Sequence, residues 1–425
     1  MEQVEKLAII ADDFTGAGDA GVHFSRCGTP TKLFLHLPSP DSLAGQEGTV
    51  SITTETRFLS VEDARETVSN MVRRCREAGF ERFYKKIDST MRGNPGGEIE
   101  AALEASGCRA ALVCTAMPET GRSCEGGTIY LDGQPLHLTE IGSDPFHPLS
   151  MSNVVDLVHL QTHMKSANLP IAAIEAGAQA LQERIGAMLE DGVRLIVADA
   201  TLSDHLDTLA QVVRQLDLLP AGAGGFARAI AHCLSNVHRP TLAQEHVQMD
   251  GPLLSIIGSL TKTSLRQADI AEKSGLYQTI SIPPRGSAQE IATICRDQMH
   301  GSNLSEANIL LRVENGKSSA SVTREQGDHV AHLLAQAATE ICKRLPIKTI
   351  FSTGGGTSIV VAEALGIGSI RLMDELMPGI VLGACQANRN NIDWFISKAG
   401  GFGNDTLLTD IAGLLSDPLL EECGS

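Results

Sequence analysis

The chain has 425 residues, which is long enough for two or three domains, and 42% of them are hydrophobic, which is enough for sizeable cores. Its formal net charge is −17, from 34 basic and 51 acidic residues, so the protein as a whole repels nucleic acid and anionic membranes. Glycine is abundant, with 41 residues, whereas aromatic residues make up 4% of the chain. This balance is typical of an α/β enzyme and excludes a binding module built on stacked aromatic platforms.

Cysteine usage and hydropathy indicate the compartment. The ten cysteines are scattered without a Cys-x-x-Cys pair, so we interpret them as reduced thiols that fill cores. No apolar run reaches the roughly 20 residues that span a bilayer. A strand is predicted close to the N-terminus, where a signal peptide would otherwise begin. We therefore expect a soluble, cytoplasmic protein with neither nucleic acid nor membrane as a partner.

Strand-like and helix-like segments alternate along the first half of the chain. The predicted strands are 7–11, 82–87, 110–114 and 194–198. The predicted helices are 15–27, 61–75, 95–106, 178–189 and 206–216. The pattern breaks at 129–136, which we interpret as a hairpin with Asp132 and Gly133 at its turn.

A polar stretch divides the chain into two α/β regions. Residues 241–252 are predicted to link an N-terminal domain, 1–240, to a C-terminal domain, 253–425. The second domain is predicted to contain strands at 253–257, 279–282, 309–313, 349–352 and 394–397. Its predicted helices are 263–273, 288–299, 330–344 and 358–365. We expect an α/β protein of two domains, each a mostly parallel sheet with flanking helices, with the active site in the cleft between them.

The segment 85–95 concentrates charge at the end of a predicted strand. Its polar side chains belong to Lys85, Lys86, Asp88, Ser89, Thr90, Arg92 and Asn94. Open α/β sheets bind ligands at the carboxyl ends of their strands, and such a cluster suits a small, hydroxylated anion. Asn94 and Pro95 are also typical of an N-cap and a first helical residue, but capping alone does not require the charges.

Two adjacent carboxylates, Asp12 and Asp13, end the first predicted strand. They could accept a proton from a substrate hydroxyl, hold that hydroxyl by a hydrogen bond, or help to hold Mg²⁺. Adjacent side chains on an extended segment point in opposite directions. We therefore predict that Asp12 contacts the ligand while Asp13 caps the next helix. Gly16 and Gly18 resemble a phosphate loop only weakly, because the third glycine is absent.

Two further strand ends carry polar residues. Arg57 could clamp a carboxylate at two points, and the alternative is a surface ion pair with Glu55 or Glu62. The loop 118–122 follows another predicted strand. Parallel strands end at one edge of a sheet, so these ends predict a substrate site. The four clusters are 12–13, 55–57, 86–94 and 118–122.

Three glycine-rich turns follow strands of the second half, at 257–261, 353–358 and 398–403. Glycine lets backbone N–H groups approach phosphate oxygens, and a helix N-terminus favours negative charge. The turns therefore predict a nucleotide-phosphate site, although none has the lysine pattern of a P-loop. The histidines lack metal-ligand spacing, so the sequence assigns no metal ligands.

Four segments together resemble the four-carbon acid sugar kinase family: 11–17, 86–94, 354–357 and 398–403. The resemblance covers nearly the whole chain. It implies an N-terminal substrate domain, a C-terminal nucleotide domain, and phosphorylation of D-threonate, D-erythronate or 3-oxo-tetronates by ATP. The residues that it implies for the acid sugar are Asp12, Arg57, Lys86, Asp88, Ser89 and Arg92. Those implied for ATP are Ser259, Gly354, Gly355, Gly356, Thr357 and Gly400.

The resemblance also favours one branch and one reaction. The segments 18–21 and 143–145 look closer to D-threonate kinases, so we expect ATP to phosphorylate the terminal hydroxyl of D-threonate, giving 4-phospho-D-threonate. Mg²⁺ is expected as the ATP counter-ion, and Asp12, Asp13 and Asp88 are the catalytic candidates. Ala399 stands where the family usually has serine, which removes one hydroxyl contact.

Alternatives of another class are a dinucleotide-dependent oxidoreductase and a non-catalytic acid-sugar sensor. The oxidoreductase would need a complete Gly-x-Gly-x-x-Gly fingerprint, which this chain lacks. The sensor would have little use for three glycine loops. The sequence also leaves open the stereochemistry of the acid and whether the chain forms a homo-oligomer.

Overall fold

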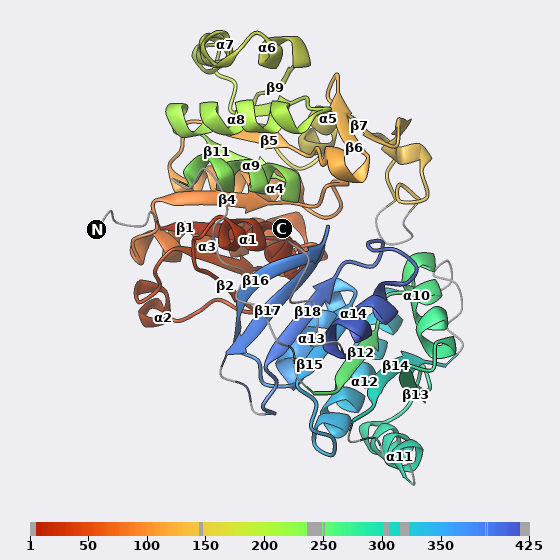
Figure 1. The fold of residues 1–425 in the computed structure, drawn as a ribbon. Helices are drawn as coiled ribbons and strands as arrows, with labels where there is room; N and C mark the ends of the chain where they lie inside the picture. Colours follow the sequence, from red (N-terminus) through yellow and green to blue (C-terminus); the bar gives the residue numbers. More distant parts are fainter. Residues whose placement is uncertain are drawn as a thin grey trace, which may run out of the picture. The chain divides into compact units, whose positions relative to one another are not determined.

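The computed structural model describes residues 6–143, 148–235, 249, 251–300, 304, 306–314, 323–386, 388 and 390–416 (Figure 1). The chain divides into two compact units, Met1–Leu242 and Ala243–Ser425. The predicted linker, 241–252, lies largely outside the described residues. The domain limits 1–240 and 253–425 therefore stay a prediction.

Unit 1 is built on one parallel sheet, with the strand order β2-β3-β1-β4-β11-β5-β10-β9. In that order the strands are Thr31–Phe34, Thr49–Thr53, Leu7–Ala11, Arg82–Lys86, Leu219–Gly222, Ala111–Cys114, Leu195–Ala198 and Ser166–Leu169. The four strands whose bounds were predicted in this half are confirmed to within a residue, whereas β2, β9 and β11 were not predicted, because Lys32, Asn168 and Pro220 interrupt their apolar pattern. All of these strands end at one edge, which is where the polar clusters were expected.

Helices cover both faces of this sheet. On one face, α3, α4 and α5 pack on inward residues such as Ile10 and Val113, and on the other α1, α7, α8 and α9 pack on residues such as Ile9 and Leu112. The helices α1 to α9 are Phe14–Arg26, Pro40–Ala44, Val61–Glu77, Pro95–Ser106, Val154–His159, Ile171–Glu175, Ala178–Glu190, Ser203–Leu216 and Gly224–Leu234. Successive strand residues face opposite sides, so a sheet covered on both faces shows a continuous apolar run.

A small antiparallel sheet, β6-β7-β8, lies beside the main sheet of unit 1. Its strands are Arg122–Glu125, Thr128–Leu131 and Gln134–Pro135, flanked by the 3₁₀ helices η1 (Pro118–Thr120) and η2 (Leu136–Leu138). The predicted hairpin is confirmed: Asp132 (φ 51°) and Gly133 (φ 79°) form the turn between β7 and β8. Asp199, after β10, fixes the other turn by accepting from the N–H groups of Gly126 and Gly127, both at 2.8 Å.

Unit 2 is also built on one sheet, with the strand order β13-β14-β12-β15-β18-β17-β16. In that order the strands are Tyr277–Ile282, Asn308–Val313, Leu253–Ile257, Thr349–Thr353, Trp394–Lys398, Ile380–Gln386 and Ser369–Met377. The helices α10 to α14 are Lys262–Lys273, Ala288–Met299, Arg324–Cys342, Gly355–Ala364 and Leu407–Ser416. The first five strands in this order, β13, β14, β12, β15 and β18, pair in parallel. β17 pairs with β18, and β16 with β17, in antiparallel orientation.

Two helix starts in unit 2 correct the sequence predictions. α12 begins at Arg324 rather than at 330, because Thr323 and Gln326 form a capping box in a polar first turn without apolar periodicity. α13 begins at Gly355 rather than at 358, so the glycines predicted as a loop belong to its first turn. Gly355 and Gly356 are the first two residues of the helix, and Gly354 is its N-cap.

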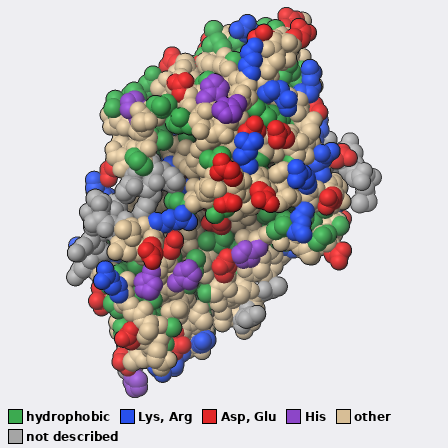
Figure 2. Space-filling view, turned by 180° about the vertical axis from the view of Figure 1, so that it is seen from behind, with side chains coloured by type: hydrophobic (Ala, Val, Ile, Leu, Met, Phe, Trp, Pro, Cys, Tyr) green, Lys and Arg blue, Asp and Glu red, His purple; other side chains and the backbone are tan. Residues whose placement is uncertain are grey.

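The surface carries charges of both signs (Figure 2), and the described cysteines are free thiols. On the face shown in Figure 2, acidic and basic side chains lie interspersed. Nine cysteines of the described residues are free thiols, as the scattered spacing predicted. Within the described part of the chain, no helix combines the length and the apolarity needed to cross a membrane.

Candidate active site

The carboxyl ends of three neighbouring strands meet at one edge of the unit 1 sheet. β3, β1 and β4 are adjacent and parallel, and their register places Ala11 opposite both Thr53 and Lys86. The residues that follow each strand therefore come together, as the sequence predicted. The fourth polar cluster, 118–122, follows β5 at the same edge, and β11 separates it from β4.

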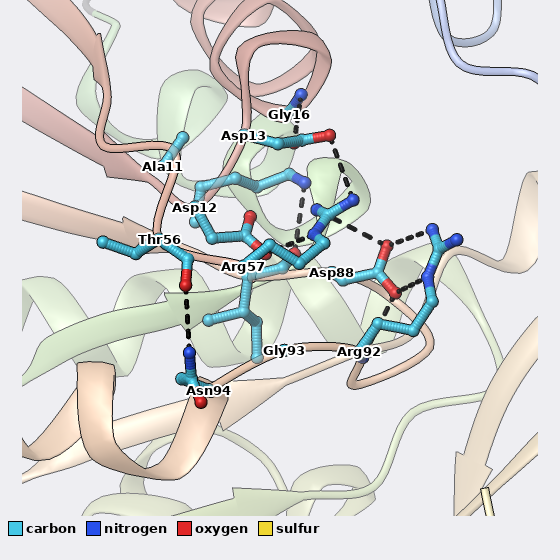
Figure 3. A network of polar contacts seen from close by, with 12 residues as sticks. Ala11, Asp12, Asp13, Gly16, Thr56, Arg57, Asp88, Arg92, Gly93 and Asn94 are labelled. Carbon is cyan, nitrogen blue, oxygen red and sulfur yellow. Dashed lines mark hydrogen bonds and ion pairs between the residues drawn. The ribbon is translucent and has the colours of Figure 1, made fainter. Parts of the chain in front are cut away.

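Arg57 lies among three carboxylates (Figure 3). Its Nε donates to Asp12 Oδ2 at 2.8 Å, and its Nη1 lies 3.0 Å from Asp13 Oδ2. Its Nη2 lies 3.8 Å from Asp88 Oδ1, and the Arg57 side chain is only 12% exposed. The alternative of a surface ion pair with a nearby glutamate is wrong, because carboxylates from the neighbouring strand ends surround the guanidinium.

The two adjacent aspartates have different roles in the fold. Asp13 is the N-cap of α1: its Oδ1 accepts from the Gly16 N–H and its Oδ2 from the Thr15 hydroxyl, both at 2.8 Å. Asp12 is buried, and only its Oδ2 bonds to Arg57; its Oδ1 has no hydrogen-bond partner among the described residues. A buried oxygen without a partner costs free energy, which a ligand hydroxyl would offset. The predicted cap is confirmed, and ligand contact by Asp12 stays a prediction.

Asp88 holds the turn after β4 together. Its two carboxylate oxygens accept from Nε and Nη2 of Arg92, at 2.8 and 2.9 Å. The Thr90 hydroxyl and the Arg92 backbone N–H also donate to Asp88. Ser89 lies in the same turn and is half-buried. The guanidinium of Arg92 is thus oriented by a two-point ion pair, with 31% of its side chain exposed.

Lys86, the last residue of β4, is a buried cation. Its ammonium lies 3.6 Å from Asp19 Oδ2 and donates to the Ile87 carbonyl at 3.1 Å. A Cβ at Gly16 would come within 3.2 Å of this ammonium, so glycine permits the approach. Gly16 and Gly18 both lie within α1, and the weak resemblance of this segment to a phosphate loop stays a prediction.

Electrostatic shifts follow from this packing. Burial by itself would raise the pKa of Asp88, but the charges of Arg92 and Arg57 hold that pKa well below its usual value. Burial and the nearby Asp13 charge raise the pKa of Glu55 to about 7. The backbone of Glu55 is also left-handed, at φ 50°, which is uncommon for a residue other than glycine. The edge therefore contains one carboxyl group that titrates near neutral pH.

Asn94 supports the loop that carries Arg57 rather than the helix after it. It occupies the N-cap position of α4, but it makes no capping bond, which corrects the predicted role. Its Nδ2 donates instead to the Thr56 carbonyl at 2.9 Å (Figure 3). It also donates to the Leu59 carbonyl, at 3.0 Å. This side chain ties the segment after β3 to the segment after β4.

A buried ion pair below the site escaped the sequence prediction. The Lys85 ammonium lies 2.7 Å from Glu98 Oε2 and also donates to the carbonyls of Ile10 and Lys86. Glu98 Oε1 accepts from the Thr56 hydroxyl at 2.9 Å. The sequence did contain a clue to this pair. Lys85 and Lys86 are adjacent on a strand, and successive side chains of a strand point to opposite faces, so one of the two lysines must face a helix layer.

Arg122 is a further cation at this edge, and it was not among the candidate residues. It begins β6, and its Nη1 donates to the Thr120 hydroxyl at 2.8 Å. Burial lowers the pKa of Arg122, while the charge of Asp88 acts in the opposite direction, so the two groups share one environment. The position of 118–122 among the strand ends was the available signal.

The glycine turns of unit 2 converge on one another. A Cβ at Gly258 would collide with the Thr357 side chain, and one at Gly400 would collide with Ser259 Oγ. A Cβ at Gly354 would lie 3.3 Å from the Ser259 backbone N, and the φ of Gly354 is 96°. The structure therefore brings Ser259, Gly354, Thr357 and Gly400 together at the ends of β12, β15 and β18.

Gly355 and Gly356 complete this cluster at the N-terminus of α13. Nothing lies within 4 Å of the place where a Gly356 Cβ would be, so this glycine faces open space. Among the segments 257–261, 353–358 and 398–404 there is no Asp or Glu. Hydroxyls, backbone groups and a helix N-terminus without nearby acids suit a phosphate chain.

Comparison with known proteins agrees with both halves of this geometry. A model described as a sugar-binding N-terminal domain matches residues 7–230, and one described as a nucleotide-binding C-terminal domain matches residues 254–408. A D-threonate kinase of Salmonella typhimurium is 30% identical, with 95% of this chain and 97% of that protein covered. The chain belongs to the four-carbon acid sugar kinase family. It is an acid sugar kinase, and the resemblance expected from its motifs is confirmed.

Other relatives in this family are named as kinases of different acids. A D-erythronate kinase of Heliobacterium modesticaldum is 28% identical, with 96% of this chain and 98% of that protein covered. A 3-oxo-tetronate kinase of Pectobacterium atrosepticum is 26% identical, with 88% and 92% covered. The relatives described here are named kinases, which supports an acid sugar kinase over the alternatives of an oxidoreductase or a non-catalytic sensor.

Solved structures support the fold. A Salmonella typhimurium protein described as a putative tRNA synthase superposes with a TM-score of 0.80 at 21% identity, over 96% of this chain and 98% of that one. A Haemophilus influenzae protein of the DUF1537 family superposes with a TM-score of 0.71 at 20% identity, over 96% and 100%. The two-unit α/β architecture is therefore shared with known structures.

Proposed function

We propose that the protein transfers the γ-phosphoryl group of ATP to the terminal hydroxyl of a four-carbon acid sugar, with D-threonate as the preferred substrate. The relatives support a tetronate as the substrate class, since three different four-carbon acids appear among their names. D-Threonate is preferred over D-erythronate and 3-oxo-tetronates because D-threonate kinases reach 30–31% identity. The segment 18–21 lies in α1, whereas 144–145 lies outside the described residues.

The observation that carries this proposal is the carboxylate of Asp12. One of its oxygens is fixed by Arg57, and the other is buried and has no hydrogen-bond partner in the described part of the chain. A substrate hydroxyl bound to Oδ1 would be oriented toward the incoming phosphoryl group, and Asp12 would accept its proton late in the transfer. Phosphoryl transfer depends chiefly on such alignment and on charge neutralisation.

The cations at the same edge suit the carboxylate of the acid sugar. Lys86, Arg92 and Arg57 stand within one cluster, each oriented by an aspartate. A guanidinium already held by a two-point ion pair loses little freedom when it also binds a substrate carboxylate. Asp88 is accordingly proposed to orient Arg92 rather than to exchange protons, and Ser89 is proposed to bind a substrate hydroxyl.

The glycine turns suit the phosphates of ATP. Gly355, Gly356 and Thr357 lie in the first turn of α13 and, with Gly400, offer backbone N–H groups, and Ser259 offers a hydroxyl beside them. The N–H of Gly354 already donates to the Lys398 carbonyl at 3.0 Å, so Gly354 would serve the site through its close backbone approach. Mg²⁺ prefers oxygen ligands and carries phosphate charge when bound. The three segments contain no carboxylate, so they fit phosphate rather than the metal, and we assign no protein ligand to Mg²⁺.

A screen of ADP release tests this proposal. Purified enzyme with ATP and Mg²⁺ is assayed against D-threonate, L-threonate, D- and L-erythronate and their 3-oxo forms. We expect D-threonate to give the highest kcat/KM and a product phosphorylated at the terminal carbon by NMR. A higher kcat/KM for D-erythronate or a 3-oxo acid would replace the substrate, and no release with any of them would overturn the assignment.

A further inference from the structure

A buried lysine lies beneath the third glycine turn of unit 2. Lys398 is the last residue of β18, and its side chain is fully buried. Its ammonium donates to the carbonyls of Gly400 and Phe402, at 2.9 and 3.0 Å, and lies 3.1 Å from the Ser264 hydroxyl. The side chain thus folds back under the turn that follows its own strand.

Helix α10 completes the support of this turn. The hydroxyls of Thr261 and Ser264 both donate to the Gly400 carbonyl at 2.8 Å. The Gln267 amide donates to the carbonyl of Phe402 at 3.2 Å. The carbonyl side of the turn is therefore bonded to the interior, which fixes the backbone conformation in which its N–H groups are presented to a ligand.

The charge of Lys398 has no counter-ion among the residues that the structure describes. Within the described residues no carboxylate forms an ion pair with it, and burial alone lowers its pKa to about 7. From α10 it faces Ser264, and its neighbours in the sheet are Thr353 of β15 and Ile380 of β17, none of which titrates. The acid at the end of the turn, Asp405, pairs with Arg266 at the surface. A buried ammonium bonded only to neutral groups is stabilised when an anion binds nearby.

We propose that Lys398 is the positive charge of the nucleotide site: it fixes the carbonyl side of the glycine turn, and phosphates bound to the other side act as its counter-ion. This inference rests on the proposed use of ATP. Lys398 does not touch the nucleotide in this arrangement, since its ammonium bonds to the turn and to α10, so it is a positioning residue with an electrostatic effect.

In this role Lys398 links nucleotide binding to proton uptake, which a purely structural lysine would not do. Free protein near pH 7.5 contains a substantial fraction of neutral Lys398, because its pKa is about 7. A bound anion favours the charged form and raises that pKa. Nucleotide binding must then be accompanied by proton uptake, and affinity must weaken as the pH rises from about 7 to about 9.

Calorimetry with a non-hydrolysable ATP analogue and Mg²⁺ tests this, without acid sugar, at pH 7.5 in buffers of different ionisation enthalpy. For the wild type we expect an observed enthalpy that varies with the buffer, which reports proton uptake. Lys398→Arg keeps a charge that cannot titrate, so it should bind while losing this uptake. Comparing these two proteins also subtracts any proton taken up by the nucleotide itself. Lys398→Met should bind at least about tenfold more weakly.

The exposed Lys273→Met, at the end of α10, is the matched control and should behave as the wild type. Equal proton uptake in wild type and Lys398→Arg would overturn the proposal, even if Lys398→Met fails to fold. A folded Lys398→Met with wild-type affinity would also overturn it. A wild-type protein that binds no nucleotide would overturn the ATP assignment as well, which distinguishes the two failures.

Discussion

The sheet edges proposed as ligand sites in the two units differ in their electrostatics. The edge of unit 1 holds charged side chains that fix one another, with Arg57 among three aspartates and Arg92 on Asp88. The edge of unit 2 has no acidic residue in its three turns and relies on glycine, hydroxyls and one buried lysine.

The contrast follows from what each edge is proposed to bind. A four-carbon acid is small, so its recognition needs several directed side chains, and these are held in place by their own ion pairs. A phosphate chain presents many equivalent oxygens, which backbone N–H groups can meet if no Cβ intervenes. Substitutions at the first edge should therefore act through unpaired charge, and those at the second through shape.

The largest expected effect is on catalysis. Asp12→Asn keeps the size of the side chain and removes its basicity, so kcat should fall by roughly 10²- to 10⁴-fold. Affinity for the ATP analogue should hardly change, because that ligand is assigned to unit 2. Steady-state kinetics with the acid sugar measures this, with the exposed Asp41→Asn as control. A near-normal kcat would transfer the role of base to Asp13 or Asp88.

The buried pair below the site should dominate the stability of unit 1. Lys85→Met leaves Glu98 buried without its cation, which should cost about 3–5 kcal/mol of unfolding free energy. The double variant Lys85→Met/Glu98→Leu removes both charges and should recover most of that loss. Hydrogen exchange resolved along the chain reads each unit separately. Equal destabilisation by the single and double variants would show that packing, not charge, is responsible.

At the uncharged edge, shape should decide. Gly356→Val should fold normally, because nothing occupies the space around its Cβ, but it should lower affinity for the ATP analogue by at least about tenfold. Gly327 of α12 also faces open space in a first helical turn, so Gly327→Val is the matched control. Calorimetry compares them. Unchanged affinity in Gly356→Val would remove this glycine from the phosphate site.

The smallest effect concerns pH. Glu55 has a pKa of about 7 in the fold against an ordinary value of 4.5, chiefly because it is buried. Its stabilising contribution is full below pH 4.5 and is lost as the pH rises to about 7. Glu55→Gln keeps a neutral side chain, so its stability loss between pH 5 and pH 8 should be smaller by about 1–2 kcal/mol. Denaturant unfolding at both values checks this, and parallel curves would contradict the shift.

The sequence predicted the alternating architecture and most strand ends, because β strands with apolar runs and capped helices carry local signals. It missed the antiparallel pair β16 and β17: β16 is partly exposed and its apolar pattern is interrupted by charges such as Asp374, whereas β17 begins with an apolar run that was overlooked. It placed the start of α13 three residues late, since glycine carries no helical periodicity.

Residue types at the site were predictable, whereas their pairing was not. Charges clustered at strand ends identified Asp12, Arg57 and Arg92, because strand ends meet at one edge in any parallel sheet. The sequence could not show that Arg57 bonds to Asp12 across separate strands, nor that Lys85 points into the core while Lys86 points to the site. Such pairings depend on strand order and on side-chain packing, which the residue pattern of one sequence does not reveal.

The central claim is that each unit binds its own ligand. Separate calorimetric titrations of D-threonate and the ATP analogue into folded Gly356→Val and folded Arg57→Gln test it most directly. We expect Gly356→Val to keep acid-sugar binding while losing the nucleotide, and Arg57→Gln to do the reverse. Loss of both ligands together in either folded variant would contradict the account.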